Sequence, residues 1–493
     1  MQRSKGTLSV SRSVTDEGKQ SGEEEADIEV GYIELALPCR VFDIDYKITA
    51  EERFQPSQEF FLRLVYAIPG ADRDQVASFF GYNQREADFV ISSAANAGYV
   101  YEIDGRLSLT SAGKDLFVSS SDDPRVFTVT SKSSRVSFDL LSLAPARRDP
   151  HIVRSLPEIP HAEDARPGQA SKSIRHEKLK LHFNELGLAR DRDGGQKSSL
   201  YSVDSVVPAE YFVETVPLYL RAQPKTPSMV TADLSQWRPD HEITDRLEVE
   251  RQVSEFVSTT KVVSRSGEAD EAFDLLSEVF PGYLDKYMTR HGLNVPKFWK
   301  DSCTRIHSFR ENRKTVPIAG PLFAKRNVKQ ISDVINYGLR GEQQTSYQKG
   351  YVWIAPQVPT WGASSVASQV NELFKESIRE KFRGQEGTGS EDEYDGPTSF
   401  CIYPGDFPQH LRYIFDRVQK SASSSIPKEL EVLLIPGILT FAAVHSPLFA
   451  NYGFPTPIGL LSFDEEAVLA TQQLLKDRLS ASINEEIREL IEP

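Results

Sequence analysis

Residues 58–117 carry the densest set of local folding signals in the chain, and these signals restrict the segment to short helices followed by a hairpin. Asp72 and Asn83 each precede a helical pattern and are followed three residues later by Gln or Glu, which is the capping-box spacing. After the second cap, apolar residues recur at helical intervals at Ala87, Val90, Ile91 and Ala94. Asp104-Gly105 then separates two runs of alternating polarity, which is typical of a hairpin turn.

This order of helices and ribbon resembles the winged helix-turn-helix family, whose most common use is to hold DNA. The resemblance covers about residues 58–117 and rests on the caps, the helical period, the hairpin turn and the helix start at Thr110-Ser111-Ala112-Gly113. It implies that the second capped helix is a recognition helix and that the ribbon is the wing beside it.

The candidate DNA contacts are polar residues expected on the outer face of that helix and on the wing, namely Gln84, Arg85, Ser92, Asn96 and Arg106. Gln, Arg and Asn side chains can pair with base edges through two hydrogen bonds at once. Glu86 and Asp88 lie beside Arg85 in the sequence, and carboxylates close to phosphates weaken non-specific binding. The alternative is therefore a winged helix that docks onto protein or serves as a scaffold.

The charge and cysteine content limit the class of protein. The net charge of −14 excludes a protein that coats nucleic acid with its whole surface, so any DNA contact must be local. The three cysteines are widely separated and match neither a disulfide framework nor a zinc spacing, which favours a reducing, cytoplasmic environment. The sequence also lacks a long apolar run and a secretory signal, so we expect no membrane partner.

At 493 residues the chain is too long for one core, and its patterns indicate a multidomain α+β fold. We expect an N-terminal winged helix, a mostly helical middle and a C-terminal α/β layer. The expected divisions are a disordered tail over 1–28, a winged-helix domain over 29–145, an irregular connection with a basic helix over 146–209, a mostly helical region over 210–345 and an α/β domain over 346–493. Within the last of these, the acidic, Gly-rich segment 384–396 is expected to be a disordered loop.

A block of basic residues in the middle of the chain is a second candidate nucleic-acid contact. Its central members are Lys297, Lys300, Arg305, Arg310, Arg313 and Lys314, interleaved with the aromatic residues Tyr287, Phe298, Trp299 and Phe309. Such a block could follow a phosphate backbone while the aromatic rings stack on bases. The alternative is that the charges pair with acidic patches elsewhere and the aromatic residues belong to the core.

The C-terminal region is similar in its order of strands and helices to one repeat of the phospholipase-D-type nucleases. In that family a strand delivers a nucleophilic His, and a Lys two residues later binds the phosphate. A strand here ends in His445, but Pro447 occupies the position of the Lys, and no residue matches the family's Asp. The resemblance thus implies a degenerate site, and a structural role for His445 is the alternative.

No motif for nucleotide binding, serine hydrolysis or zinc-dependent proteolysis is present. Cys303 and His307 share a helical spacing, but two ligands do not make a metal site, so we expect no metal and no cofactor. These observations favour a DNA-associated, non-enzymatic protein, either a transcription regulator or an accessory subunit of a DNA-processing or phage-defence assembly, with further protein partners. The alternatives are a phospholipase-D-like phosphodiesterase or nuclease targeted by the winged helix, and an interaction scaffold that binds no nucleic acid.

Overall fold

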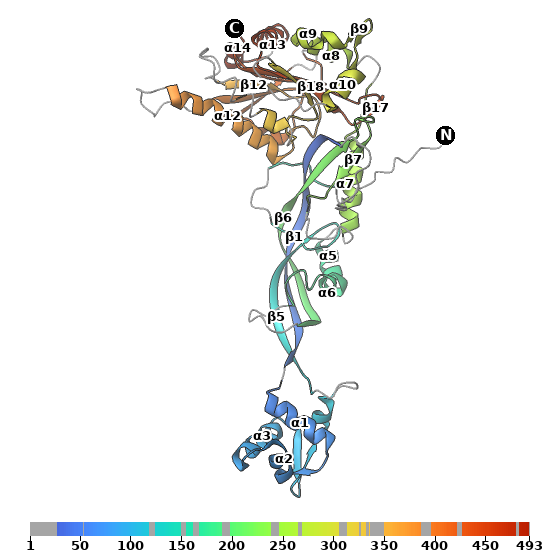
Figure 1. Cartoon of the computed structure of the whole chain (residues 1–493), viewed down its shortest axis with the longest axis vertical. Helices are drawn as coiled ribbons and strands as arrows, with labels where there is room; N and C mark the ends of the chain where they lie inside the picture. The colour runs from blue at the N-terminus through green and yellow to red at the C-terminus, as the bar shows by residue number, and fades with distance from the viewer. Residues whose placement is uncertain are drawn as a thin grey trace, which may run out of the picture. The chain divides into compact units, whose positions relative to one another are not determined.

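The structure is a computed structural model, and its chain divides into two units that interleave along the sequence (Figure 1). The first unit comprises Met1–Pro38, Arg148–Ala162 and Val213–Pro493, and the second comprises Cys39–Arg147 and Glu163–Phe212. The residues described are 27–52, 54–117, 124–148, 154–160, 167–189, 198–237, 246–264, 269–304, 313–324, 327–331, 335, 350–385, 396–421, 426–479 and 483–492. The expected tail and the expected loop 384–396 therefore lie almost entirely outside the described residues.

The second unit contains a compact module between two long strands. Strand β1 (Ile28–Glu52) precedes the module, and strand β5 (Val126–Asp139) follows it. The module consists of α1 (Pro56–Ala67), β2 (Ala71–Asp72), α2 (Arg73–Phe80), α3 (Gln84–Asn96), β3 (Val100–Ile103), β4 (Arg106–Leu109) and α4 (Ser111–Asp115). Its three strands pair antiparallel in the order β2-β4-β3.

Local signals in the sequence set the boundaries of these helices. Both expected capping boxes are confirmed, because the side chains of Asp72 and Asn83 each accept a hydrogen bond from the backbone N–H three residues on. The backbone N–H of each cap residue in turn donates to the side chain of that third residue. The hairpin turn at Asp104-Gly105 is also confirmed, with φ angles of 52° and 77° that suit such a turn. Thr110 caps α4 by accepting a hydrogen bond from the Gly113 backbone at 2.9 Å.

The module has its own hydrophobic core. Leu107 from the middle strand and Phe61 from α1 are fully buried, and they pack with residues of α2, α3 and β3, namely Val76, Val90, Ile91, Ala94 and Val100. The four apolar residues that recur along α3 all face this core, which confirms the helical period expected there. The opposite face of α3 is therefore exposed.

The rest of the second unit is built on the long strands. Residues 39–52 of β1 pair antiparallel with the whole of β5, and β6 (Ser199–Ala222) is the next strand beside β1. A helical segment covers β1 through Ile174 and Leu179, which form a core with Phe42, Ile44 and Phe183 of the following turn. It consists of α5 (Pro167–Ser173), a π-helical turn η1 (Ile174–Lys178) and α6 (Leu179–Leu181).

The first unit is centred on a seven-stranded mixed sheet with the order β11-β18-β16-β15-β12-β13-β14. The strands are β11 (Thr315–Ala319), β12 (Gly350–Ile354), β13 (Thr398–Pro404), β14 (Arg417–Ser421), β15 (Leu430–Ile435), β16 (Leu439–Ser446) and β18 (Thr456–Ser462). Most of these strands are buried along their whole length, as expected for a sheet covered on both faces.

Helices cover both faces of this sheet (Figure 1). On one face, α12 (Ser365–Gln385) packs through Phe374 against a core that includes Trp353 and Phe441. On the other face lie α8 (Asp270–Val279), α13 (Glu465–Leu479) and α14 (Glu485–Ile491). There the Thr440 and Thr471 hydroxyls are hydrogen-bonded at 2.8 Å between β16 and α13.

The remaining described elements of the first unit are short. They are β7 (Val230–Asp233), α7 (Leu247–Thr259), β8 (Val262–Val263), α9 (Pro281–Leu284), the 3-10 turn η3 (Asp285–Tyr287), β9 (Met288–Thr289), β10 (Gly292–Leu293), α10 (Val295–Thr304), the 3-10 turn η5 (Gln409–Tyr413) and β17 (Tyr452–Gly453). None of the helices in the described ranges is long and apolar enough to cross a bilayer.

Two segments differ from the sequence expectations. The region expected to be mostly helical from residue 210 begins as a strand, because β6 continues to Ala222 and pairs there with β7. Residues 406–422 have a local pattern that suits a helix after β13, but they form η5 and then the edge strand β14. Pairing with β13 provides hydrogen-bond partners for the backbone N–H and C=O groups of β14. This long-range pairing overrides a local sequence pattern that also suits a helix.

We predict that Gly113→Ala destabilises the module by about 3 kcal/mol, because a Cβ atom at Gly113 would lie only 2.1 Å from the Tyr99 carbonyl oxygen. Gly168→Ala in α5 is the matched control, since nothing lies within 4 Å of its Cβ position and alanine favours a helix. Chemical denaturation of the full-length variants measures both effects. Equal stability of the two variants would contradict the close packing of α4 on the chain at Tyr99.

Candidate functional site

The exposed face of α3 carries a continuous stripe of four side chains. Arg85, Phe89, Ser92 and Asn96 follow one another at intervals of four, three and four residues, which places them along one side of the helix. All four are exposed, and Gln84 is exposed at the start of the same helix. The stripe can therefore present a guanidinium, an aromatic ring, a hydroxyl and an amide to the same partner.

All five residues predicted to contact DNA are exposed in the structure: Gln84, Arg85, Ser92, Asn96 and Arg106. Four of them lie on α3, and Arg106 opens β4 directly after the hairpin turn. The prediction omitted Phe89, whose side chain is 70% exposed in the middle of the stripe. The sequence did contain a signal for this exposure. Phe89 lies four residues after Arg85, on the same side of the helix, and it is not among the apolar positions that repeat along the buried side.

Arg73 holds one carboxylate on α3 and one on β3. Its Nη1 lies 2.6 Å from Asp88 Oδ1 on α3, and its Nη2 lies 2.7 Å from Glu102 Oε2 on β3. The Nε atom donates a further hydrogen bond to Glu102, so that this pair is held through two nitrogens. The hydrogen bond from Arg73 holds the pKa of Glu102 below its usual value. One cation thus joins α2, α3 and β3 and compensates one of the two negative charges that it contacts.

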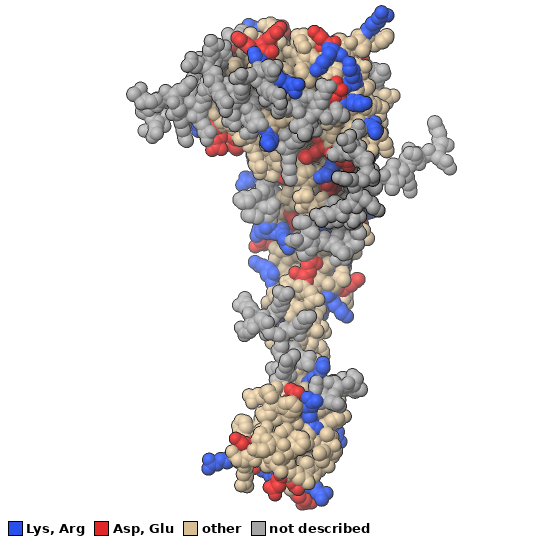
Figure 2. Space-filling view, in the orientation of Figure 1, with Lys and Arg blue, Asp and Glu red and all other residues tan. Residues whose placement is uncertain are grey.

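The module as a whole is nevertheless acidic. Residues 56–117 contain five cationic and eight anionic side chains, a net charge of −3; the cations are Arg63, Arg73, Arg85, Arg106 and Lys114. Arg63 pairs with Glu59 and Arg73 with two carboxylates, whereas Arg85 and Arg106 make no ion pair with a described residue. In Figure 2 red and blue side chains are interspersed over the viewed face of the described residues. Positive charge for a phosphate backbone is therefore confined to a few positions.

The described aromatic residues of the basic block are not exposed for stacking on bases. Phe298 and Trp299 are fully buried, and Tyr287 is 2% exposed, so these rings belong to the core. The Trp299 Nε1 atom donates a hydrogen bond to the Pro224 carbonyl oxygen at 2.8 Å, which fixes the indole inside the fold. Phe309, Arg305 and Arg310 lie outside the described residues.

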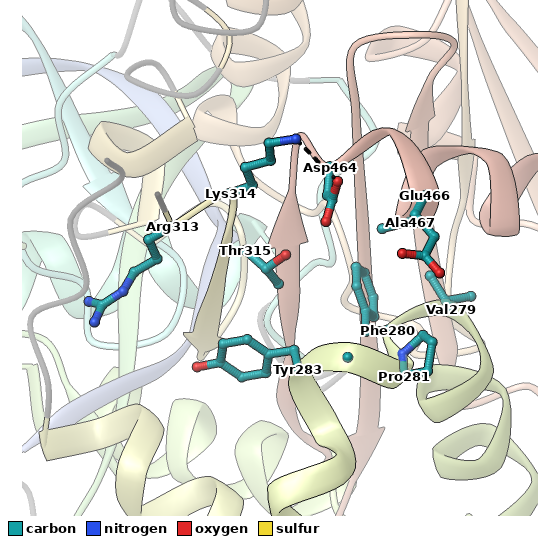
Figure 3. A pocket seen from close by; sticks show the side chains of 11 residues that line it. Val279, Phe280, Pro281, Tyr283, Arg313, Lys314, Thr315, Asp464, Glu466 and Ala467 are labelled. Atoms are coloured by element: carbon teal, nitrogen blue, oxygen red, sulfur yellow. Dashed lines mark hydrogen bonds and ion pairs between the residues drawn. The ribbon is translucent and has the colours of Figure 1, made fainter. Parts of the chain in front are cut away.

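The described basic residues of that block separate into two groups. Lys297 and Lys300 are exposed on α10. Arg313 and Lys314 precede β11 and line a pocket of about 470 Å³ (Figure 3). The other walls of this pocket come from the end of α8, from α9 and from the start of α13. Its volume lies in the usual range for small-molecule sites.

The pocket has cations on one side, carboxylates on the other and an apolar base (Figure 3). Lys314 Nζ reaches across to Asp464 Oδ1 at 3.4 Å. The carboxylate of Glu466 lies beyond Asp464, at the start of α13, where the helix dipole favours negative charge. The chain thus places groups of both signs around one small volume.

His445 lies in a buried chain of hydrogen bonds at the end of β16. Its Nε2 atom lies 2.6 Å from Glu431 Oε2 on β15, and the Trp353 indole donates to Glu431 Oε1 at 3.0 Å. His445 is 5% exposed and Glu431 is 1% exposed. The imidazole and the indole together satisfy both oxygens of a carboxylate buried in the sheet.

These surroundings offer nothing to a phosphodiester. The cavity beside His445 measures about 40 Å³, whereas ligand sites usually exceed about 300 Å³. Among the described residues that line it there is no Lys, no Arg and no second His. The group nearest to the imidazole is a carboxylate, which would repel a phosphate. The geometry therefore agrees with a structural role for His445.

The described residues contain no group of three or more His, Cys, Asp or Glu side chains that could hold a metal ion. Cys303 forms no disulfide bond within the described part of the chain, and His307 lies outside that part.

We predict that Glu431→Ala lowers the free energy of unfolding by about 3–5 kcal/mol, because it leaves a buried imidazole and a buried indole N–H without their partner. Glu431→Gln should cost about 1–2 kcal/mol, because the amide oxygen still accepts from Trp353 and the amide nitrogen can donate to His445. Denaturation followed by tryptophan fluorescence measures both. An alanine variant no less stable than the glutamine variant would show that this buried network does not contribute as described.

Comparison of the chain with protein-family models, with curated proteins and with solved structures finds no match.

Proposed function

We propose that this chain is a DNA-associated, non-enzymatic protein in which residues 56–117 act as a winged helix. The observation that supports this function best is the exposed stripe on α3, with Asp88 and Glu102 held by Arg73. A helix that shows base-reading residues on its free face, beside a short hairpin, is suited to the major groove of a duplex. The module would serve in a transcription regulator or in an accessory subunit of a DNA-processing or phage-defence assembly, with protein partners bound elsewhere on the chain.

The residues of the stripe have different chemical preferences among bases. The guanidinium of Arg85 suits the two acceptors of guanine, and the amide of Asn96 suits the donor and acceptor of adenine. The exposed ring of Phe89 suits the methyl group of thymine. Arg106 on the wing is placed on a different element and suits a phosphate. Binding would then depend on both base sequence and salt.

The shortage of cations limits the strength of such binding. Affinity for a duplex comes largely from phosphates that Lys and Arg neutralise, and this module offers only Arg85, Arg106 and Lys114 outside its ion pairs. The chain also carries a net charge of −14, which repels DNA at long range. We therefore propose a local contact that is weak alone and is strengthened by a partner protein in the assembly.

A second candidate function is protein docking through the same module without nucleic acid. Three large apolar side chains favour it, because Phe79, Phe89 and Ile103 are 68%, 70% and 62% exposed on α2, α3 and β3. Exposed rings of this size are common at protein interfaces and are costly to leave in water.

We predict that full-length protein binds a mixed-sequence duplex at about 50 mM salt and loses most of that binding at about 200 mM. Arg85→Ala should weaken binding about tenfold to a hundredfold and relax base preference, whereas Arg106→Ala should lower the slope of log affinity against log salt by about one. Fluorescence anisotropy with labelled duplexes measures both effects.

Arg478→Ala is the matched control, since it removes one positive charge from an exposed position on α13, in the other unit. A loss of affinity equal to that of Arg85→Ala would show that only net charge matters. The absence of duplex binding at low salt, in protein whose helix content is unchanged, would reject the DNA function in favour of the docking function.

A further inference from the structure

The pocket between α9, β11 and α13 is not used by the proposed DNA contact, and all of its walls belong to the first unit. Figure 3 shows Arg313 on one side and Glu466 on the other, with the paired Lys314 and Asp464 between them. The Phe280 and Tyr283 rings lie below these charged groups. The arrangement is an apolar base flanked by charges of opposite sign.

The two outer charges are available to a ligand. Neither Arg313 nor Glu466 makes an ion pair or a side-chain hydrogen bond with any described residue, and both are exposed. The inner charges, by contrast, already compensate each other across 3.4 Å. A ligand can therefore gain one charge-assisted contact at each end of the pocket without breaking the pair of Lys314 and Asp464.

A further cation lies next to the pocket lining. Lys286 Nζ lies 4.0 Å from the centre of the Tyr283 ring, which is part of that lining. A ligand with negative charge alone would meet Asp464 and Glu466, and a ligand with positive charge alone would meet Arg313 and Lys314. Only a ligand with one positive and one negative group, separated by an apolar portion, can make a favourable contact with every part of the lining.

We propose that this pocket binds a small zwitterion, in which an anionic group contacts Arg313 and an ammonium group contacts Glu466 while an apolar chain lies over Phe280 and Tyr283. The volume of about 470 Å³ accommodates a molecule of this size. In a DNA-associated protein such a site would be an effector site, but the binding itself does not depend on any DNA contact.

The test uses the full-length chain and ligands that differ only in charge. ε-Aminocaproate carries both charges on one apolar chain, while hexanoate keeps only the carboxylate and hexylamine only the ammonium. Titration calorimetry should detect ε-aminocaproate, with hexanoate and hexylamine each bound at least about tenfold more weakly. Glycine and γ-aminobutyrate, which have shorter chains, test the separation of the two charges and should also bind more weakly.

Two adjacent carboxylates supply a matched pair of variants. Glu466→Gln removes the charge that lines the pocket and should weaken ε-aminocaproate about tenfold, as should Arg313→Gln. Glu465→Gln removes an exposed charge from the same turn of α13 outside the lining and should leave the affinity unchanged.

Three results would overturn the proposal. Hexanoate bound as tightly as ε-aminocaproate would make the pocket a simple anion site. An equal loss in the Glu465 and Glu466 variants would show a general charge effect. The absence of heat with ε-aminocaproate and with both shorter zwitterions, in protein that unfolds at the normal temperature, would remove the site altogether. None of these results depends on whether the chain binds DNA.

Discussion

The antiparallel pairing of β1 with β5 is the constraint on which the α3 module depends. The register runs from Cys39 opposite Asp139 to Glu52 opposite Val126, so the two strands that enter and leave the module are already paired at its base. Once this ladder has formed, the ends of the intervening chain are adjacent, and closing it as a loop costs little further entropy. The module then needs only its own core to fold, which it has around Phe61 and Leu107. The module between β1 and β5 can thus fold into a defined structure, with α3 in a fixed orientation, although it is short and carries a net negative charge.

The features of this module that could be predicted from sequence are those set by neighbours in the chain. A helix cap involves residues three positions apart, a hairpin turn involves two residues, and the helical period repeats every three or four residues. The helix starts at Asp72 and Asn83 can therefore be predicted without any knowledge of the tertiary structure. The bridge from Arg73 to Asp88 and Glu102 spans 15 and 29 residues and depends on the packed positions of three elements. No sequence pattern specifies such a bridge. The same limit explains β14, where pairing with a distant strand decides between two locally acceptable conformations.

Only part of the candidate site could be predicted, because only part of it depends on residues that are close together in the sequence. Polar positions of α3 follow directly once the buried positions are known, and all of the predicted ones are exposed. The polar positions alone do not reveal that an aromatic ring stands among them, because an apolar residue in an amphipathic helix is normally assigned to the core. Phe89 changes the chemistry of the face, since it adds an apolar contact where few cations are available. A face of this kind gains more of its binding energy from base edges or from a protein surface than from phosphates, and this balance is the reason to expect selective rather than general binding.

The buried Glu431 shows why the order of strands and helices along a chain is a poor basis for predicting the chemistry of a site. A strand that ends in a histidine is compatible with a nucleophile, but the reactivity of an imidazole depends on what faces it. In a phosphodiesterase the neighbours of the histidine must stabilise the negative charge of a phosphate. Here the neighbour is a carboxylate whose second oxygen accepts a hydrogen bond from Trp353, and the cavity of about 40 Å³ beside His445 is far too small for a phosphodiester. A carboxylate in that position stabilises a hydrogen-bonding imidazole and opposes a phosphate, so the surroundings of His445 fit a structural role in the sheet better than phosphate chemistry.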